Sequence, residues 1–261
     1  MSSKEVKVIL LAAGEGKRLR PFTLDRPKCL VEIGGQSLLD RQLSVLRSKG
    51  LNDVVVIGGY KAEMLSDKGI DLRINRKYAE TNMVFTLFSA ESELKGEVLI
   101  CYGDIVYSDE ILQKILDSTA DIATTIDMNW ESYWGERFEN PLDDAETLKI
   151  DQEFHVIEIG RKPKTLREID GQYMGIIKLS EKGVQIFKSV YHQGVIDNEI
   201  MGQPVESAYM TDLLQVIIDS GHSISAVPVY GDWVEVDTVS DLKASITMER
   251  LSNISNSVIQ N

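Results

Sequence analysis

Basic side chains gather in a short glycine-containing stretch near the start of the chain. Residues 11–28 read LAAGEGKRLRPFTLDRPK, and their five cations are Lys17, Arg18, Arg20, Arg26 and Lys28. Gly14 and Gly16 let the backbone approach a ligand closely, and successive amides in such a turn can point at one anion. Because the whole chain carries a net charge of -13, this local basic cluster predicts a small polyanionic ligand.

Two common phosphate-binding motifs do not fit this stretch. A Walker loop requires a glycine five residues before its Gly-Lys pair and Ser or Thr after it, where this chain has Leu11 and Arg18. A dinucleotide-binding fingerprint requires a third glycine, where the chain has Leu19. A bare Gly-x-Gly is equally consistent with a simple turn between a strand and a helix, so the glycines alone do not decide.

The full spacing of the stretch is more specific. It reads Leu-Ala-Ala-Gly-x-Gly-x-Arg-Leu-x-Pro-x-Thr, with Pro-Lys after three more residues, and closely resembles the signature of the sugar-nucleotidyltransferase superfamily. In that family a phosphorylated acceptor attacks the α-phosphorus of a nucleoside triphosphate and pyrophosphate leaves. The resemblance implies that Arg18 holds the leaving β and γ phosphates and that Lys28 neutralises charge at the α-phosphate. It also implies nucleotide contacts from Leu11, Ala12, Ala13, Gly14, Glu15 and Gly16.

Carboxylates for a metal ion stand at the ends of two predicted strands. Nucleotidyl transfer needs cations around the α-phosphate and carboxylates that hold Mg²⁺. Asp104 in CYGD and Asp237 in WVEVD match the family's two metal-binding aspartates. Without the signature, each would be better explained as the cap of the helix that follows. With the signature, we predict that both bind Mg²⁺.

The base-binding side is predicted from the residues after the second strand. Gly59 and Tyr60 border a base pocket or form a plain turn, and the two interpretations are equally supported. Asn82 either bonds a base edge or caps a helix. Residues 75–82, NRKYAETN, are similar to the corresponding region of cytidylyltransferases with non-sugar acceptors, which favours CTP.

The acceptor side is predicted from the resemblance and from one departure from it. Lys162 in IGRKP matches the lysine that contacts the acceptor phosphate in hexose-1-phosphate enzymes, and Gly175 in YMGIIKL matches their acceptor-side glycine. Those enzymes usually carry a glutamate immediately before that lysine, whereas this chain has Arg161. The second cation suits a more anionic acceptor than a neutral hexose.

Aromatic and acidic residues alternate in residues 130–146, WESYWGERFENPLDDAE. Trp130 and Trp134 with Asp144 and Glu146 suit an acceptor that bears an amine or quaternary ammonium group, although packing of both tryptophans is the simpler explanation. Nearly the whole chain resembles the small bacterial cytidylyltransferases that act on phosphocholine, 2-aminoethylphosphonate or phosphorylated glutamine. NPLDDAETLK points to the last type, which implies a role in cell-surface polysaccharide or phosphonate biosynthesis.

Composition limits the remaining possibilities. With 43% hydrophobic and 26% charged residues, the 261-residue chain is typical of a globular protein and predicts one domain over 1–261. No leader, long apolar run or hexapeptide repeat of a C-terminal β-helix is visible, so we expect a cytoplasmic protein. The acidic balance argues against nucleic acid and membrane partners, and homo-oligomerisation is left open.

Cys29 and Cys101 lack the spacing of a metal or redox site, and His155, His192 and His222 lack a nucleophile partner.

Alternating strand and helix patterns predict an α/β fold. We expect a Rossmann-like, three-layer α/β/α nucleotidyltransferase fold, a mostly parallel mixed central sheet, and a small acceptor-side insertion at 129–172. The expected strands are 6–12, 53–57, 71–75, 97–102, 121–128, 148–150, 155–159, 171–179, 223–229 and 233–236. The expected helices are 37–50, 61–68, 81–93, 108–118, 180–191, 210–220 and 239–251, with a frayed polar tail after Ser252.

Three rival functions follow from the same residues. A UTP- or dTTP-dependent hexose-1-phosphate enzyme keeps the chemistry but changes the substrates, and Arg161 argues against it. A regulator with a degraded site would lack a signature cation or a metal carboxylate, but all four are present. A metal-dependent glycosyltransferase would normally show Asp-x-Asp where this chain has Asp104-Ile105-Val106.

Overall fold

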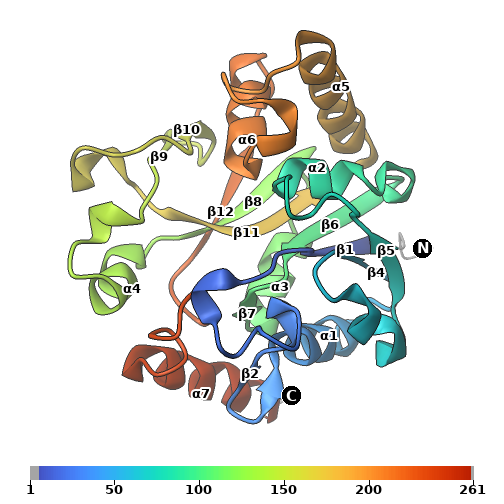
Figure 1. The fold of residues 1–261 in the computed structure, drawn as a ribbon. Helices are drawn as coiled ribbons and strands as arrows, with labels where there is room; N and C mark the ends of the chain where they lie inside the picture. The colour runs from blue at the N-terminus through green and yellow to red at the C-terminus, as the bar shows by residue number, and fades with distance from the viewer. Residues whose placement is uncertain (1–5, 260–261) are drawn as a thin grey trace.

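The computed structural model describes residues 6–259 and is built around a seven-stranded sheet. Its strands are β1 (Val6–Ala12), β4 (Val54–Gly58), β5 (Asp71–Ile74), β6 (Glu97–Tyr102), β8 (Ile122–Asp127), β11 (Gln172–Leu179) and β12 (Ser225–Val229). Their order is β12-β8-β11-β6-β1-β4-β5 (Figure 1). Only β11 runs antiparallel to its neighbours within this sheet. The predicted mostly parallel mixed sheet is therefore confirmed.

Helices cover both faces of the sheet, as Figure 1 shows. One face carries α1 (Leu38–Ser48), α3 (Asp109–Leu116) and α7 (Ser245–Ile259), and the other carries α2 (Met83–Phe88), α5 (Glu181–Asp197) and α6 (Met210–Asp219). Successive residues of β1 alternate between these two layers: Val8 and Leu10 join one apolar core, and Ile9 and Leu11 join the other. This two-sided burial explains why β1 reads as a continuous apolar run. Within residues 6–259, none of the helices has the length and apolar character needed to cross a bilayer.

Smaller elements surround the central sheet. Three strand pairs are β2 (Glu32–Ile33) with β3 (Gln36–Ser37), β7 (Ile105–Tyr107) with β13 (Trp233–Glu235), and β9 (Leu148–Ile150) with β10 (Val156–Ile159). Helix α4 (Trp130–Arg137) lies with β9 and β10 to one side of the sheet in Figure 1. Short 3-10 turns complete the chain: η1 (Lys17–Leu19), η2 (Lys28–Leu30), η3 (Ala62–Lys68), η4 (Glu91–Glu93), η5 (Pro141–Asp143), η6 (Leu166–Glu168) and η7 (Val205–Ser207).

Several predicted helix boundaries are wrong. The segment 61–68 forms a 3-10 turn rather than an α-helix, and 81–93 breaks into α2 and η4 because Ala90 leaves the helical conformation (φ −120°). Helix α5 extends past the predicted end at 191 and ends where Asn198 adopts a left-handed conformation (φ 59°). That residue makes a compatible C-terminal cap.

The C-terminal helix departs most from the prediction. The helix predicted at 239–251 does not start at residue 239, because Asp241 Oδ2 accepts the backbone N–H groups of Asp237 and Thr238 and closes a turn there. Helix α7 starts only at Ser245 and continues to Ile259, so the segment predicted to fray is helical up to that residue. The last two residues of the predicted tail lie outside the described part of the chain.

Candidate active site

A cavity of about 460 Å³ opens at the carboxyl ends of β1 and β6. This is the edge at which open α/β sheets bind ligands. The lining comes from the glycine-containing turn, the segment before α2, the end of β6 and the end of β13. It comprises Leu11, Ala12, Ala13, Gly14, Glu15, Gly16, Lys17, Arg18, Lys28, Cys29, Tyr78, Ala79, Thr81, Asn82, Met83, Thr86, Tyr102, Gly103, Asp104, Glu235 and Asp237.

The glycine-containing turn is shaped by contacts at its two ends. Gly16 has a positive φ of 63°, and a Cβ there would lie 3.1 Å from the Lys28 Cβ, so glycine is required. A Cβ on Gly14 would meet no described atom within 4 Å, and the missing side chain leaves open space in the cavity. Leu19 is fully buried in an apolar cluster with Val234 and anchors the turn. Burial explains why leucine occupies the position of a third glycine.

Lys28 and Arg18 are paired with the two predicted metal-binding aspartates. Lys28 Nζ lies 2.7 Å from Asp104 Oδ2 and also contacts Asp237 Oδ1. The Arg18 guanidinium lies 3.0 Å from Asp237 Oδ2. Burial alone would lower the pKa of Lys28, but the carboxylates of Asp104 and Asp237 outweigh it and raise the pKa above its usual value. Lys28 is therefore charged at neutral pH.

A strand pair brings the two aspartates together. β7 and β13 are antiparallel with Ile105 opposite Glu235, and Val236 N–H donates to the Asp104 carbonyl at 3.0 Å. Each aspartate directly adjoins this ladder, which fixes their separation through main-chain hydrogen bonds. The sequence pattern predicts the strand ends, but only the pairing brings the carboxylates to one point.

The two carboxylates fit a Mg²⁺ ion. Asp104 Oδ1 is buried and has no hydrogen-bond partner among the described residues, which leaves one oxygen for a ligand. Within residues 6–259 no group of three or more His, Cys, Asp or Glu side chains forms a complete metal cage. Mg²⁺ commonly binds through one or two carboxylates and completes its shell with water and substrate phosphates, so a pair is sufficient.

Glu235 is a cavity residue that the sequence analysis missed. Burial and the nearby Asp237 charge raise its pKa to about 8, despite an ion pair between its Oε2 and Arg137 Nη1 at 2.8 Å. A usable signal was present in the sequence, because residues two apart at a strand end point to the same side. Tyr102 also lines the cavity and was not predicted, whereas Tyr78 and Thr81 of the lining belong to the stretch 75–82 that favours CTP.

Of the residues predicted to bind the base, Asn82 lies in the cavity lining, whereas Gly59 and Tyr60 lie outside it. Gly59 packs so closely that a Cβ would lie 2.5 Å from the Tyr78 Cβ, and Tyr60 N–H donates to the Ala13 carbonyl at 3.0 Å. Both residues buttress the turn from outside the cavity lining. Asn82 lines the cavity, and its Oδ1 accepts the Met83 N–H at 2.9 Å as the N-cap of α2.

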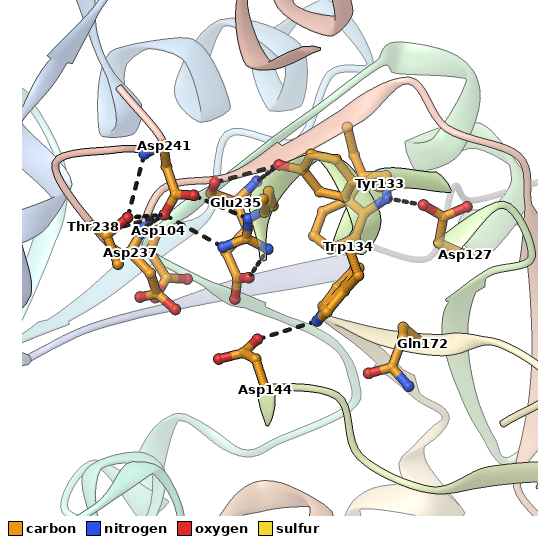
Figure 2. Close-up of polar contacts among 12 residues, drawn as sticks. Asp104, Asp127, Tyr133, Trp134, Asp144, Gln172, Glu235, Asp237, Thr238 and Asp241 are labelled. Carbon is orange, nitrogen blue, oxygen red and sulfur yellow. Dashed lines mark hydrogen bonds and ion pairs between the residues drawn. The ribbon is translucent and has the colours of Figure 1, made fainter. Parts of the chain in front are cut away.

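The predicted acceptor-side residues lie beyond the cavity lining, on and around the insertion. Trp130 and Trp134 are each only 4% exposed and belong to the apolar core, so the packing explanation describes their position. Trp134 Nε1 donates to Asp144 Oδ2 at 3.1 Å, with the indole pointing towards that carboxylate (Figure 2). Lys162 Nζ is bonded to the carbonyls of Leu142 and Asp143.

Glu146 and Gly175 both lie close to Tyr102. Burial raises the pKa of Glu146, although a hydrogen bond from Thr211 favours its charged form. Gly175 has a φ of 82° at an irregularity in β11, and a Cβ there would lie 2.6 Å from the Tyr102 ring. Glycine thus permits close packing against Tyr102, a residue of the cavity wall.

Known proteins share both the sequence and the fold. The family model of the MobA-like NTP transferase domain matches residues 8–148. CTP:phosphoglutamine cytidylyltransferase from Campylobacter jejuni is 37% identical over 254 residues, which cover 92% of this chain and 99% of that protein. Choline-phosphate cytidylyltransferase from Streptococcus pneumoniae is 36% identical over 118 residues, which cover 44% of this chain and 52% of that protein.

Two solved structures share the fold over nearly the whole chain. CTP:phosphocholine cytidylyltransferase from Streptococcus pneumoniae has a TM-score of 0.70 at 22% identity, with 96% of this chain and 99% of that chain covered. The inositol-1-phosphate CTP transferase from T. maritima has a TM-score of 0.74 at 19% identity, with 98% of each chain covered. The chain therefore belongs to the MobA-like NTP transferase family and is a nucleotidyltransferase, as the resemblance of its glycine-containing signature predicts.

Proposed function

We propose that the protein is a Mg²⁺-dependent cytidylyltransferase. It would transfer CMP from CTP to a small phosphorylated or phosphonate acceptor that bears an amine, and release pyrophosphate. The observation that carries the proposal is the cluster of Lys28, Arg18, Asp104 and Asp237 beside the glycine-containing turn. This cluster combines phosphate-binding cations with a carboxylate pair at one cavity wall.

The reaction needs positioning and charge neutralisation more than proton transfer. A phosphate or phosphonate oxygen of the acceptor is already anionic at neutral pH, so it forms the new bond to the α-phosphorus without a general base. The bond from the α-phosphorus to the bridging oxygen breaks in line, and pyrophosphate takes the electron pair. Lys28 would offset charge at the α-phosphate and Arg18 would hold the leaving phosphates. A Mg²⁺ ion bound by Asp104 and Asp237 would supply further charge neutralisation.

The choice of an amine-bearing acceptor rests on a group of carboxylates in and beside the insertion. Glu146 has a raised pKa because it is buried, and Asp144 and Asp212 lie near enough to raise it further. An ammonium group of the acceptor would relieve this cost by pairing with a carboxylate. The name of the Campylobacter jejuni relative, which refers to phosphoglutamine, supports the same class of acceptor.

The choice of CTP rests on the relatives. The two curated relatives described above are both named as cytidylyltransferases. Within the cavity, the candidate base-side wall is the segment from Tyr78 to Met83, which contributes five residues to the lining: Tyr78, Ala79, Thr81, Asn82 and Met83.

The test crosses nucleotides with acceptors. Pyrophosphate release is measured with Mg²⁺ and each of CTP, UTP, dTTP, ATP and GTP, against phosphoglutamine, phosphocholine, 2-aminoethylphosphonate and glucose 1-phosphate. We expect release with CTP and an amine-bearing acceptor. Release only with glucose 1-phosphate and UTP or dTTP would instead support the hexose-1-phosphate enzyme.

A further inference from the structure

Arg137 is a buried cation that joins the insertion to the candidate metal-binding loop. It is the last residue of α4, and its side chain is 0% exposed. Its Nη1 lies 2.8 Å from Glu235 Oε2, and its Nε lies 3.0 Å from Asp241 Oδ1. The guanidinium thus bridges one carboxylate that lines the cavity and a second carboxylate behind it.

The second carboxylate controls the backbone at Asp237. Asp241 Oδ2 accepts the Asp237 N–H at 2.9 Å and the Thr238 N–H at 2.8 Å. In Figure 2, Asp241 lies beside Thr238 and Asp237, and dashed lines mark hydrogen bonds within this group. Arg137 therefore reaches Asp237 through Asp241.

Aromatic rings hold the guanidinium in one orientation. Its central carbon lies 5.1 Å from the Tyr133 ring centre, 5.3 Å from that of Trp134 and 5.1 Å from that of Phe138. The Tyr133 hydroxyl also accepts the Glu235 N–H at 3.0 Å, so helix α4 holds both the main chain and the side chain of Glu235. A planar guanidinium with several fixed donors suits this task better than the single ammonium group of lysine.

We propose that Arg137 is a positioning residue. By holding Glu235 and, through Asp241, the backbone of Asp237, it keeps Asp237 in the arrangement needed to bind the divalent cation together with Asp104. The inference rests on the proposed function, because it assigns the carboxylates of that same site to a metal. Burial of an ion cluster is weak evidence for a stabilising role, whereas partners behind a metal ligand commonly tune metal affinity.

Arg250 provides a matched control. It is also a buried arginine, its guanidinium lies 3.9 Å from the centre of the same Tyr133 ring, and its side chain is 10% exposed. Its Nη1 lies 3.4 Å from Asp127 Oδ2 and donates to the Trp233 carbonyl at 3.3 Å, and no hydrogen bond or ion pair in the described part of the chain joins it to Glu235 or Asp241. A loss that reflects general packing around Tyr133 would affect both arginines, whereas a positioning role belongs to Arg137.

The experiment compares Arg137→Lys with Arg250→Lys, using Mn²⁺ as the probe. Free Mn²⁺ is measured by electron paramagnetic resonance during titration of each folded protein, with and without CTP, and urea denaturation reports stability. We expect Arg137→Lys to weaken Mn²⁺ binding about 10- to 100-fold, the range found when such outer partners are removed, and Arg250→Lys to leave it unchanged. Equal Mn²⁺ affinities for Arg137→Lys and the wild type, or an equal loss in both variants, would overturn the inference.

A second variant keeps the test decisive if Arg137→Lys does not fold. Asp241→Asn retains a carbonyl oxygen for the Asp237 and Thr238 amides but loses the charge that pairs with Arg137. We expect this variant to weaken Mn²⁺ binding in the same direction, and unchanged binding would count against the inference. If the wild type binds Mn²⁺ but releases no pyrophosphate with any nucleotide and acceptor, the proposed function fails while the Mn²⁺ comparison still tests Arg137.

Discussion

Lys28 occupies the centre of the candidate site because two carboxylates surround its ammonium group. The Lys28 side chain is only 14% exposed, and its contacts to Asp104 and Asp237 keep it charged despite burial. A charged group held in a partly dry site interacts strongly with a phosphate, because little water competes for it. Because the site is partly desolvated, we expect substitution of either carboxylate partner, Asp104 or Asp237, to have a large effect on turnover.

Asp104→Asn and Asp237→Asn should each impair turnover strongly. We expect kcat to fall by about 10²- to 10³-fold, the effect of losing one electrostatic contact in the transition state. Steady-state pyrophosphate release measures the effect, and circular dichroism shows whether the fold is retained. Near-normal turnover in either folded variant would remove that residue from the metal site.

Glu146→Gln should stabilise the protein in a pH-dependent manner. Burial raises the folded-state pKa of Glu146 above its ordinary value of 4.5. The protonated form is therefore favoured by folding, and its stabilising contribution is complete below that value and is lost as the pH rises through the folded-state pKa. Glutamine is neutral at every pH, so we expect its advantage in the free energy of unfolding to be larger at pH 8 than at pH 4.

Urea denaturation of both proteins at the two pH values measures this difference. We also expect Glu146→Gln to raise KM for an amine-bearing acceptor more than it changes KM for CTP. A stability difference that is equal at both pH values, or that reverses, would contradict the assignment of Glu146 as a carboxyl destabilised by burial.

Helix α2 begins at the wall of the cavity, because its N-cap Asn82 and its first residue Met83 both belong to the lining. Asn82 caps α2 by accepting the Met83 N–H, and its Nδ2 donates to the Ser207 carbonyl at 3.3 Å. Both ends of the amide are thus engaged by the protein. The residue lines the cavity and also ties α2 to the segment before α6.

Substitutions at Asn82 separate capping from base recognition. Asn82→Ala should lower the free energy of unfolding by about 1 kcal/mol, and Asn82→Ser should largely retain stability because serine is also a good cap. We expect Asn82→Ser to keep the ratio of kcat/KM for CTP over UTP. A folded Asn82→Ser variant with a clearly altered ratio would indicate direct contact with the base.

The elements that the sequence predicts well are those defined by local patterns. β6 and β9 begin and end at the predicted residues, and Ser37 caps α1 by accepting the Asp40 N–H. The start of α7 was not predictable in this way, because Asp241 is taken up by the turn at Asp237. Arg137 gave no local signal either, since its carboxylate partners Glu235 and Asp241 are 98 and 104 residues away.

The candidate site also combines features that local sequence patterns predict with features that depend on distant contacts. Its signature and strand-end aspartates are recognisable in the sequence, because each belongs to a short motif with fixed spacing. The position of Glu146 relative to Thr211 and the burial of Trp130 depend on how the insertion packs against the sheet. Packing of that kind depends on contacts between distant segments, so composition and periodicity do not reveal it.

In the molecule as a whole, segments from the first and the last parts of the chain pack together around Leu19 of the signature. An apolar cluster contains Leu19, Val31 and Ile33 from the first part of the chain and Val234, Val236, Leu251 and Ile254 from the last part. Helix α7 therefore supports the turn that carries Arg18 and the strand that leads to Asp237. Stability of the C-terminal helix and order in the site should be linked.

Leu251→Ala should be strongly destabilising. The side chain is 4% exposed, and its removal would leave a cavity in this cluster, which typically costs about 2–5 kcal/mol. Met248→Ala is the control on the same helix, since Met248 is 44% exposed and should have little effect. Urea denaturation compares the two variants, and a loss at Leu251 no larger than at Met248 would contradict the role of this cluster.

The proposed reaction joins the α-phosphorus of CTP to an acceptor phosphate. The most direct measurement is ³¹P nuclear magnetic resonance of a mixture of the protein, Mg²⁺, CTP and phosphoglutamine. We expect the CTP signals to be replaced by those of pyrophosphate and, in equal amount, by two coupled signals of a new diphosphate linkage. Persistence of unreacted CTP with every amine-bearing acceptor, or its conversion only to CDP and inorganic phosphate, would contradict the claim.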